Sequence, residues 1–401
     1  MQIELNKSEI ETLQDSLTAY EQQPNDNALI QTMIKGLFRL MLGKDPNESA
    51  NEDKLTAEKG QQVAEQRKQQ TDHMRDYFAQ LTRLQNVAFR LRVANRDDCK
   101  ERTSAQIGLA AGTVASLPRK YRSFTHEALS VSWTQATVLS VAETSPAGIA
   151  GIKAGDHLLT FNNQPVPRYA TGRWIANFVR HNGESPIQVL VRRDGADMTY
   201  TVSPVMACSI PVELISDSSV DAFTDGDKIV IHSSILRMAP TDAQLALVIG
   251  HELAHANLGH LDAKLVNKVV GWAGGAVLDA GVMLGGISTN GAFSKAFSRA
   301  GASAFSVGFE READYVGAYY TARAGYDLAG AEEVWRVLSR EQPDSIHIAA
   351  THPITPVRFV QMQKVAAEIA EKQRRKAPLM PELRNVQAGA GHSTIAAESI
   401  H

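Results

Sequence analysis

The sequence has few cysteines and little net charge, and it lacks several common binding motifs. Its 401 residues include two cysteines, Cys99 and Cys208, which are too few for a metal cluster built on thiolates. The formal net charge of −3 at pH 7 provides no basic surface of the kind that a general nucleic-acid-binding protein needs. No phosphate-binding loop of the form GxxxxGK[ST] occurs. We therefore expect no nucleic acid among the partners.

The chain also lacks a clean apolar run long enough for a membrane-spanning helix. The nearest stretch, residues 269–288, reads VVGWAGGAVLDAGVMLGGIS, and its six glycines and Asp279 make it a poor membrane span. A hairpin that only touches a membrane remains an open alternative there. The stretch NALIQTMIKGLFRLMLGK, residues 27–44, spaces its apolar residues as a helix does. It predicts an amphipathic packing helix, with a helix on a membrane surface as the alternative.

The chain begins MQIELNKSEIETL, which lacks the basic and then apolar pattern of a secretory signal. The protein is therefore expected either in the cytosol or as a chain from which a leader has been removed. The two cysteines are either separate buried thiols or one disulfide that closes a long loop. Such a bond would contribute up to about 4–5 kcal/mol in the entropic model and would require an oxidising compartment. The sequence leaves both alternatives open.

Composition and periodicity divide the chain into four regions. Residues 1–95 are expected to be helical, because apolar residues recur there at helical spacing. Residues 120–205 are rich in alternating β-branched residues, which predicts strands. Residues 210–370 carry the motifs described below. Residues 371–401 form a tail that is expected to be partly disordered.

Short motifs in the β-rich region resemble those of a PDZ domain. The resemblance depends on Ser145-Pro146-Ala147, Ala150-Gly151-Ile152, Gly155-Asp156 and Asn162-Asn163. Asn stands at 163 where Gly is common, and Asn also tolerates positive φ. A hairpin is expected at Asp194-Gly195. The resemblance implies that an extended peptide adds to a sheet edge. The alternative is a small β domain that acts as a spacer, and no carboxylate-binding loop can be identified from the sequence.

The segment GHELAHANLGH, residues 250–260, concentrates titratable side chains on a predicted helix. Thr241 and Gln244 form a capping box, so the helix should begin near Asp242 and run to about Gly259. His251 and His255, four residues apart, project from one face and are suited to bind one zinc ion. Glu252 beside them is suited to act as the general base in a hydrolysis that zinc assists.

A hydrolytic zinc site needs a third protein ligand and an open position. His260 is near, but five residues past His255 it is expected to point elsewhere as a helix-end residue. The segment FSVGFEREADYVG offers Glu310 and Asp314, four residues apart on one helix face. Glu310 is the better third ligand, and Asp314 is suited to accept a hydrogen bond from a ligand histidine. Glu312 should face away from Glu310, and an ordinary charged helix surface is the alternative for the whole segment.

Three segments together resemble a known family. They are HELAH, then EREADYVG about fifty residues later, and THPITPVR at residues 351–358. The chain is similar to the gluzincin zinc peptidases that include the CAAX prenyl proteases, the bacterial heat-shock membrane protease and the mitochondrial Oma-type protease. Within them it is similar to bacterial envelope members that carry a PDZ domain. The resemblance covers residues 210–370, and the PDZ motifs add 120–205.

The resemblance implies one zinc ion per chain and a set of residues around it. The implied metal ligands are His251, His255 and Glu310. Glu252 would be the general base, and Asp314 would be the acid that orients a ligand histidine. His352 and Arg358 would stabilise the tetrahedral oxyanion, although His352 has the alternative role of a latch on the open metal position. A simple helix-start turn is the alternative for THPITPVR.

The sequence thus predicts an α+β protein. It predicts a mostly helical zincin-type metallopeptidase domain with an inserted or preceding PDZ-like module. The predicted function is zinc-dependent hydrolysis of peptide bonds in protein or peptide substrates, in envelope protein quality control or processing. The implied location is the bacterial cell envelope, periplasmic or membrane-associated. The alternative is a chaperone-like or PDZ binding factor whose metal cleft is latched and largely inactive. The natural substrate and the oligomeric state do not follow from the sequence.

Overall fold

The computed structural model describes residues 36, 46–117, 119, 122–260, 292–341 and 356–382, without the side chains of 46–53 and 292–307. The chain divides into two compact units, residues 1–72 and 73–401, and each is described by itself. Several expectations fall outside the described residues. They concern nearly all of the stretch at 27–44, the glycine-rich stretch at 269–288, His352, and the tail beyond residue 382.

Helix α3 (Pro46–Ala94) begins in the first unit and ends in the second. In the first unit the side chains of residues 54–69 are all exposed, as their polar composition leads one to expect. In the second unit the helix buries a stripe of apolar residues that recur every three or four positions. This stripe consists of Met74, Phe78, Leu81, Leu84, Val87, Ala88 and Leu91, and Phe89 is buried as well.

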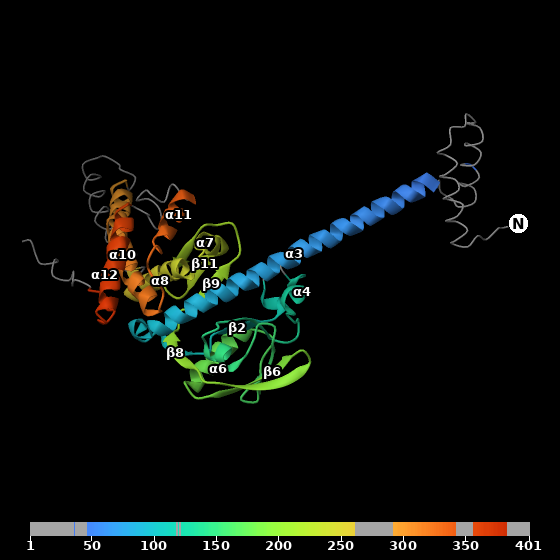
Figure 1. Cartoon of the computed structure of the whole chain (residues 1–401), viewed down its shortest axis with the longest axis horizontal. Coiled ribbons are helices and arrows are strands. Elements are labelled where there is room, and N and C mark those ends of the chain that lie inside the picture. Colours follow the sequence, from blue (N-terminus) through green and yellow to red (C-terminus); the bar gives the residue numbers. More distant parts are fainter. Residues whose placement is uncertain are drawn as a thin grey trace, which may run out of the picture. The chain divides into compact units, whose positions relative to one another are not determined.

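The β-rich module contains a six-stranded antiparallel sheet, in which five strands follow the order β2-β3-β4-β6-β7 and β5 pairs with β4. Its strands are β2 (Leu109–Gly112), β3 (Thr137–Val141), β4 (His157–Phe161), β5 (Gln164–Pro165), β6 (Ile187–Arg193) and β7 (Ala196–Val202). Its helices are α4 (Thr125–Leu129), α5 (Pro146–Ala150) and α6 (Thr171–Asn182), with the 3-10 turn η2 (Val114–Ser116). Strand β2 is the terminal strand of the described sheet, and α6 lies beside it (Figure 1).

The turn motifs of this module take the backbone conformations that their residues favour. Asn162 and Asn163 both have positive φ, at 46° and 64°, which an asparagine tolerates better than most residues. The expected hairpin joins β6 to β7, and Asp194 and Gly195 both have positive φ, as a type I′ turn requires. Buried Asp156 accepts two hydrogen bonds from Arg193, at 2.6 and 2.7 Å, so the Gly-Asp element is tied to the end of β6.

The rest of the second unit is mostly helical. A small sheet has the strand order β10-β11-β9, with β9 (Val212–Ile215), β10 (Ala222–Thr224) and β11 (Ile229–His232). The helices are α7 (Ser233–Met238), α8 (Asp242–Leu258), α10 (Ala292–Arg323), α11 (Glu333–Glu341) and α12 (Pro356–Arg374). The predicted capping box of α8 is present, with Thr241 and Gln244 bonded to each other's backbone. Residues 244–256 are all buried, so α8 is a central core helix and the predicted α+β class is confirmed.

Helices α8 and α10 cross at two glycines. A Cβ atom added to Gly317 would lie 2.7 Å from the backbone nitrogen of His251, and one added to Gly250 would lie 2.7 Å from the carbonyl oxygen of Gly317. Thr321 donates a hydrogen bond to the carbonyl oxygen of Ala246, 3.2 Å away, one turn along each helix from the crossing. Only residues without a side chain allow the two backbones to approach this closely.

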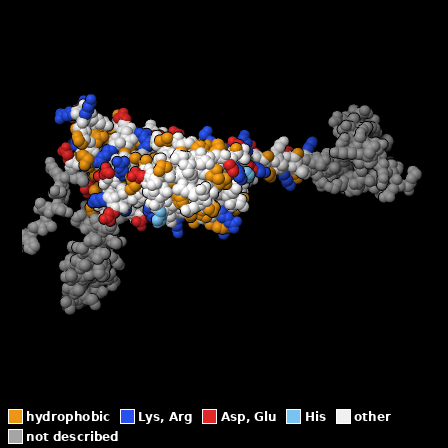
Figure 2. Space-filling model, turned by 90° about the horizontal axis from the view of Figure 1, so that it is seen from below, with side chains coloured by type: hydrophobic (Ala, Val, Ile, Leu, Met, Phe, Trp, Pro, Cys, Tyr) orange, Lys and Arg blue, Asp and Glu red, His pale blue; other side chains and the backbone are white. Residues whose placement is uncertain are grey.

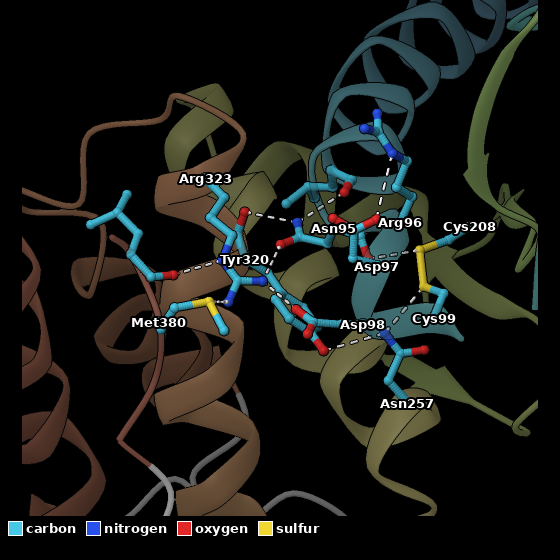
Figure 3. A network of polar contacts seen from close by, with 12 residues as sticks. Asn95, Arg96, Asp97, Asp98, Cys99, Cys208, Asn257, Tyr320, Arg323 and Met380 are labelled. Atoms are coloured by element: carbon cyan, nitrogen blue, oxygen red, sulfur yellow. Dashed lines mark hydrogen bonds and ion pairs between the residues drawn. A yellow bond between two sulfur atoms is a disulfide. The ribbon is translucent and has the colours of Figure 1, made fainter. Parts of the chain in front are cut away.

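A disulfide and a short ribbon join the β-rich module to the helical region. Cys99, in the 3-10 turn η1 (Arg96–Cys99), is bonded to Cys208. Cys208 ends β8 (Val205–Cys208), which pairs antiparallel with β1 (Thr103–Gln106), so both ends of the module are tied together. Figure 3 shows the disulfide beside Asn257 of α8, whose amide donates to Cys99 Sγ and to the Tyr320 hydroxyl, both at 3.3 Å.

The surface carries charges of both signs. On the face seen in Figure 2, acidic and basic side chains are interspersed with apolar ones, and neither sign dominates. Among the helices of the described residues, none has both the length and the apolar character that a membrane crossing needs.

We predict that Gly317→Ala destabilises the protein and weakens the site that α8 and α10 form. The added methyl group would overlap the backbone of α8, and such overpacking costs about 1–3 kcal/mol. Gly308→Ala is the matched control on the same helix, because a Cβ atom there meets nothing within 4 Å. Thermal unfolding should show a lower midpoint for Gly317→Ala alone. Equal midpoints for the two variants would contradict the close-approach argument.

Candidate metal centre

Three buried side chains from α8 and α10 bring their ligand atoms together. Nε2 of His251 lies 3.1 Å from Nε2 of His255, and the carboxylate oxygens of Glu310 lie 3.3 Å from the first and 3.4 Å from the second. Atoms bound at about 2.0–2.1 Å to one tetrahedral ion lie about 3.3–3.4 Å from one another. Two imidazoles and a carboxylate are also donors that divalent metal ions accept. The three residues therefore fit a single metal ion.

Residue spacing on α8 and the crossing of α8 with α10 together position these donors. His251 and His255 are one turn apart on α8, and the glycine crossing brings α10 close enough for Glu310 to face them. Their residue exposures are 2%, 4% and 0%, so water does not solvate the carboxylate. A buried carboxylate is costly unless charged or hydrogen-bonding partners surround it.

Asp314 and Arg358 supply such partners. Arg358, from α12, donates from Nε and Nη2 to the two oxygens of Asp314, at 2.6 and 2.7 Å. Its Nη1 lies 3.1 Å from a carboxylate oxygen of Glu310. Burial raises the pKa of Asp314, but the Arg358 charge and hydrogen bonds outweigh this and leave the pKa below its ordinary value. Arg358 thus compensates two buried negative charges at once.

Asp314 also reaches a candidate metal ligand. Its Oδ1 lies 3.0 Å from Nδ1 of His251, on the side of the ring opposite the Nε2 that faces Glu310. A proton on Nδ1 then leaves the lone pair on Nε2 for a metal ion. Glu252 lies one residue further along α8, is buried, and interacts electrostatically with Arg358. The structure therefore brings together six of the seven predicted site residues, and the seventh, His352, lies outside the described residues.

His260 also joins this cluster, but it faces the Nδ1 side of the His255 ring and not the three candidate ligand atoms. Its Nδ1 lies 3.0 Å from Nδ1 of His255, and its Nε2 lies 3.3 Å from Glu312. The helix ends close to Gly259, as expected: α8 stops at Leu258, and Gly259 takes a left-handed conformation with φ of 70°, which changes the direction of the chain. His260 is thus a helix-end residue, as predicted, but its ring faces the cluster.

Trp335 is a neighbour of the site that the sequence did not indicate. It comes from α11, and its ring makes an edge contact with His251 at a centroid distance of 5.5 Å. The guanidinium carbon of Arg358 lies 5.3 Å from the Trp335 ring centroid. The segment EVWRVLSRE reads as an ordinary amphipathic helix, so no sequence signal distinguishes this tryptophan from a core residue.

The protonation of His251 makes metal binding depend on pH. Burial lowers the pKa of His251, but hydrogen bonds and charges from Asp314 and Glu310 outweigh burial and raise the pKa to about 9. The metal-free protein therefore carries an imidazolium at neutral pH. A metal ion must displace one proton from it, because a ligand histidine must be neutral.

We predict that metal affinity rises by about tenfold per pH unit from about pH 7 to about pH 8.5. The sign follows because the competing proton is bound below a pKa of about 9 and leaves as the pH approaches it. Zinc titration against a competing chromophoric chelator would measure the slope. Asp314→Asn removes a contact that raises this pKa and should flatten the slope. A parent slope near zero would show that His251 is already neutral.

Two family models match the chain: a PDZ domain over residues 105–203 and peptidase family M48 over residues 206–366. The mitochondrial metalloendopeptidase OMA1 of Arabidopsis thaliana is 33% identical over 164 residues, which cover 40% of this chain and 33% of that protein. The beta-barrel assembly-enhancing protease of Escherichia coli O157:H7 is 27% identical over 168 residues, which cover 39% of this chain and 34% of that protein. The protease of the same name from Yersinia pestis is 27% identical over 158 residues, which cover 36% of this chain and 32% of that protein.

The chain thus spans about a third of the length of the curated relatives it matches. All of the described residues of the cluster, from His251 to Arg358, lie inside the second matched range. Residues 206–366 thus match peptidase family M48, and residues 105–203 match a PDZ domain.

Proposed function

We propose that this protein is a zinc-dependent endopeptidase, with one zinc ion held by His251, His255 and Glu310. The observation that carries the proposal is the spacing of three buried donor atoms, 3.1–3.4 Å apart, inside a range that matches peptidase family M48. Zinc, when bound, supplies a Lewis acid that acidifies water and polarises a peptide carbonyl. Three protein ligands leave the fourth position open for the reaction.

Glu252 is the residue we assign to proton transfer. It follows a ligand histidine on α8, and its carboxylate is the general base that takes a proton from the attacking water. It then gives the proton to the leaving amine, so the carboxylate is regenerated in each turnover. Burial beside Arg358 keeps this carboxylate in a place where bulk water does not compete for the proton.

Arg358 and His352 were both expected to stabilise the oxyanion, and the contacts of Arg358 favour a different role for it. Three of its nitrogens are engaged by Asp314 and Glu310, so its charge is directed at the carboxylates that support the metal. We therefore propose that Arg358 positions Glu310 and Asp314. The oxyanion contact, or the latch, remains our proposal for His352.

We propose that the PDZ domain binds an extended segment of the substrate between β2 and α6. Strand β2 ends the described sheet, and strand addition at such an edge is how PDZ domains take peptides. Residues 106–109 lead into β2 and are our assignment for the carboxylate-binding loop. In this structure Gln85, Phe89 and Arg92 of α3 line the same groove, and only about 80 Å³ of cavity remains. A peptide needs more room, so α3 must move for it to bind.

The proposed setting is the bacterial cell envelope, in the quality control or processing of envelope proteins. The Cys99–Cys208 disulfide supports an oxidising compartment, because the cytosol keeps thiols reduced. The names of the relatives refer to a mitochondrial metalloendopeptidase and to a protease that enhances beta-barrel assembly. The substrates we propose are proteins or peptides, which both a PDZ groove and a peptidase site accept. Association with a membrane surface belongs to the same proposal.

A chaperone-like or binding factor with a latched metal cleft is the competing function. It would need the metal cluster for structure and not for hydrolysis. Glu252 distinguishes the two functions, because it is not one of the three proposed metal ligands. Hydrolysis requires it as the general base, whereas a structural metal site does not.

We predict that Glu252→Gln lowers the rate of casein hydrolysis by about 10²–10⁴-fold while zinc stays bound, because only the general base is lost. Glu310→Ala should lose both zinc and activity, because it removes a ligand. Glu184→Gln, at an exposed position of the PDZ domain, is the charge-matched control. Hydrolysis rates and zinc content would be measured together. Full activity in Glu252→Gln, or cellular function that survives it, would favour the binding-factor alternative.

We also predict that Phe89→Ala opens the PDZ groove. The Phe89 ring lies over Gly108, since a Cβ atom built there would be 3.0 Å from its Cδ2. Removing the ring should tighten binding of a random decapeptide pool with a free α-carboxylate by about tenfold, because the open state gains population. Val93→Ala, on the same helix but outside this groove, is the control. Fluorescence anisotropy would measure binding, and unchanged affinity in Phe89→Ala would reject α3 as the cover.

A further inference from the structure

His255 uses both of its ring nitrogens inside the cluster. Its Nε2 lies 3.1 Å from Nε2 of His251 and 3.4 Å from Glu310, on the side proposed to face the metal. Its Nδ1 lies 3.0 Å from Nδ1 of His260, on the other side. A nitrogen that binds a metal must offer a lone pair, so the proton of neutral His255 resides on Nδ1. That N–H needs an acceptor, because it is buried.

This requirement fixes the tautomer of His260 as well. Nδ1 of His260 must accept the hydrogen bond, since two N–H groups cannot face each other at 3.0 Å. The proton of His260 then resides on Nε2, which lies 3.3 Å from a carboxylate oxygen of Glu312 and donates to it. The chain of contacts from His255 through His260 to Glu312 is therefore consistent at every atom.

We propose that His260 is a positioning residue for His255, oriented in turn by Glu312. This proposal rests on the proposed metal function of His255. It gives the two histidines separate supports: Asp314 holds Nδ1 of His251, and His260 holds Nδ1 of His255. Partners of this kind fix the tautomer and ring orientation of a ligand and raise metal affinity.

The balance of buried charge explains why the partner of His255 Nδ1 is the neutral imidazole of His260 and not a carboxylate. Glu310, Asp314 and Glu252 already place three buried carboxylates around one Arg358 guanidinium. A further buried carboxylate against His255 would need compensation that the described cluster does not supply. His260 transmits the hydrogen bond to Glu312, whose side chain is 41% exposed and is therefore solvated.

The fold holds His260 in this place from two sides. The left-handed Gly259 ends α8 and returns the chain toward His255. The His260 ring then stacks on Phe309, with centroids 4.6 Å apart and an interplanar angle of 18°. Phe309 directly precedes Glu310, so one turn of α10 carries the stacking partner, a proposed ligand and Glu312.

Two substitutions separate the hydrogen bond from the ring packing. His260→Phe keeps an aromatic ring to stack on Phe309 but has no acceptor, and we expect it to weaken zinc binding by about 10–100-fold. His260→Asn loses the ring but keeps an oxygen near the position of Nδ1, and we expect its zinc affinity to stay within about threefold of the parent. Zinc affinity would be measured by chelator competition on the full chain.

A purely structural role for His260 predicts the opposite order, with His260→Phe nearer the parent than His260→Asn, and that order would overturn the proposal. Should both variants unfold, Glu312→Ala gives a second test at a half-exposed position. It should lower zinc affinity by less than His260→Phe without lowering the thermal midpoint, and an unchanged affinity would overturn the relay. A parent chain that binds no zinc would instead reject the proposed function, so the two failures are distinguishable.

Discussion

The close crossing of α8 and α10 is the constraint on which the rest of the site depends. At the crossing, a Cβ atom added to Gly250 or to Gly317 would lie 2.7 Å from a backbone atom of the other helix. This contact determines how far Glu310, two turns before Gly317 on α10, stands from the imidazoles on α8. Because both helices are buried at the crossing, neither can tilt away without opening the core. The spacing of the three candidate ligand atoms is therefore a consequence of helix packing rather than of flexible side chains.

The second constraint is the balance of buried charge. Three imidazoles, three carboxylates and one guanidinium share a volume from which water is largely excluded. Arg358 lies beside the carboxylates of Glu310 and Asp314 and interacts electrostatically with Glu252. Without a metal ion, His251 supplies additional positive charge by holding a proton. A divalent ion would replace that proton with a larger positive charge, so a proton and a metal ion compete to compensate the buried carboxylates. Either cation would therefore stabilise the cluster.

Local patterns made part of this arrangement predictable from the sequence. The capping box located the start of α8, and residues four apart on a helix had to share a face, which linked His251 with His255 and Glu310 with Asp314. The sequence did not reveal contacts that depend on where a helix ends or on how distant elements pack. The left-handed conformation of Gly259 redirects the chain so that His260 faces His255. Trp335 contacts His251 from α11, whose sequence does not differ from that of an ordinary amphipathic helix. The contact of Phe89 with Gly108 likewise depends on packing between elements that are distant in the sequence.

The C-terminal turn of α8 is where the PDZ domain and the metal centre share a border. Arg102, just before β1, donates to the carbonyl oxygen of Ala256, one residue beyond His255. Asn257, the next residue, contacts both Cys99 and Tyr320 of α10 (Figure 3). The disulfide then joins this border to Cys208, which follows the PDZ domain in the sequence and pairs with Thr103 of β1. A displacement of the PDZ domain would therefore act first on the helix turn that carries His255 and leads into His260. The orientation of one proposed metal ligand and the position of the PDZ domain depend on the same few contacts.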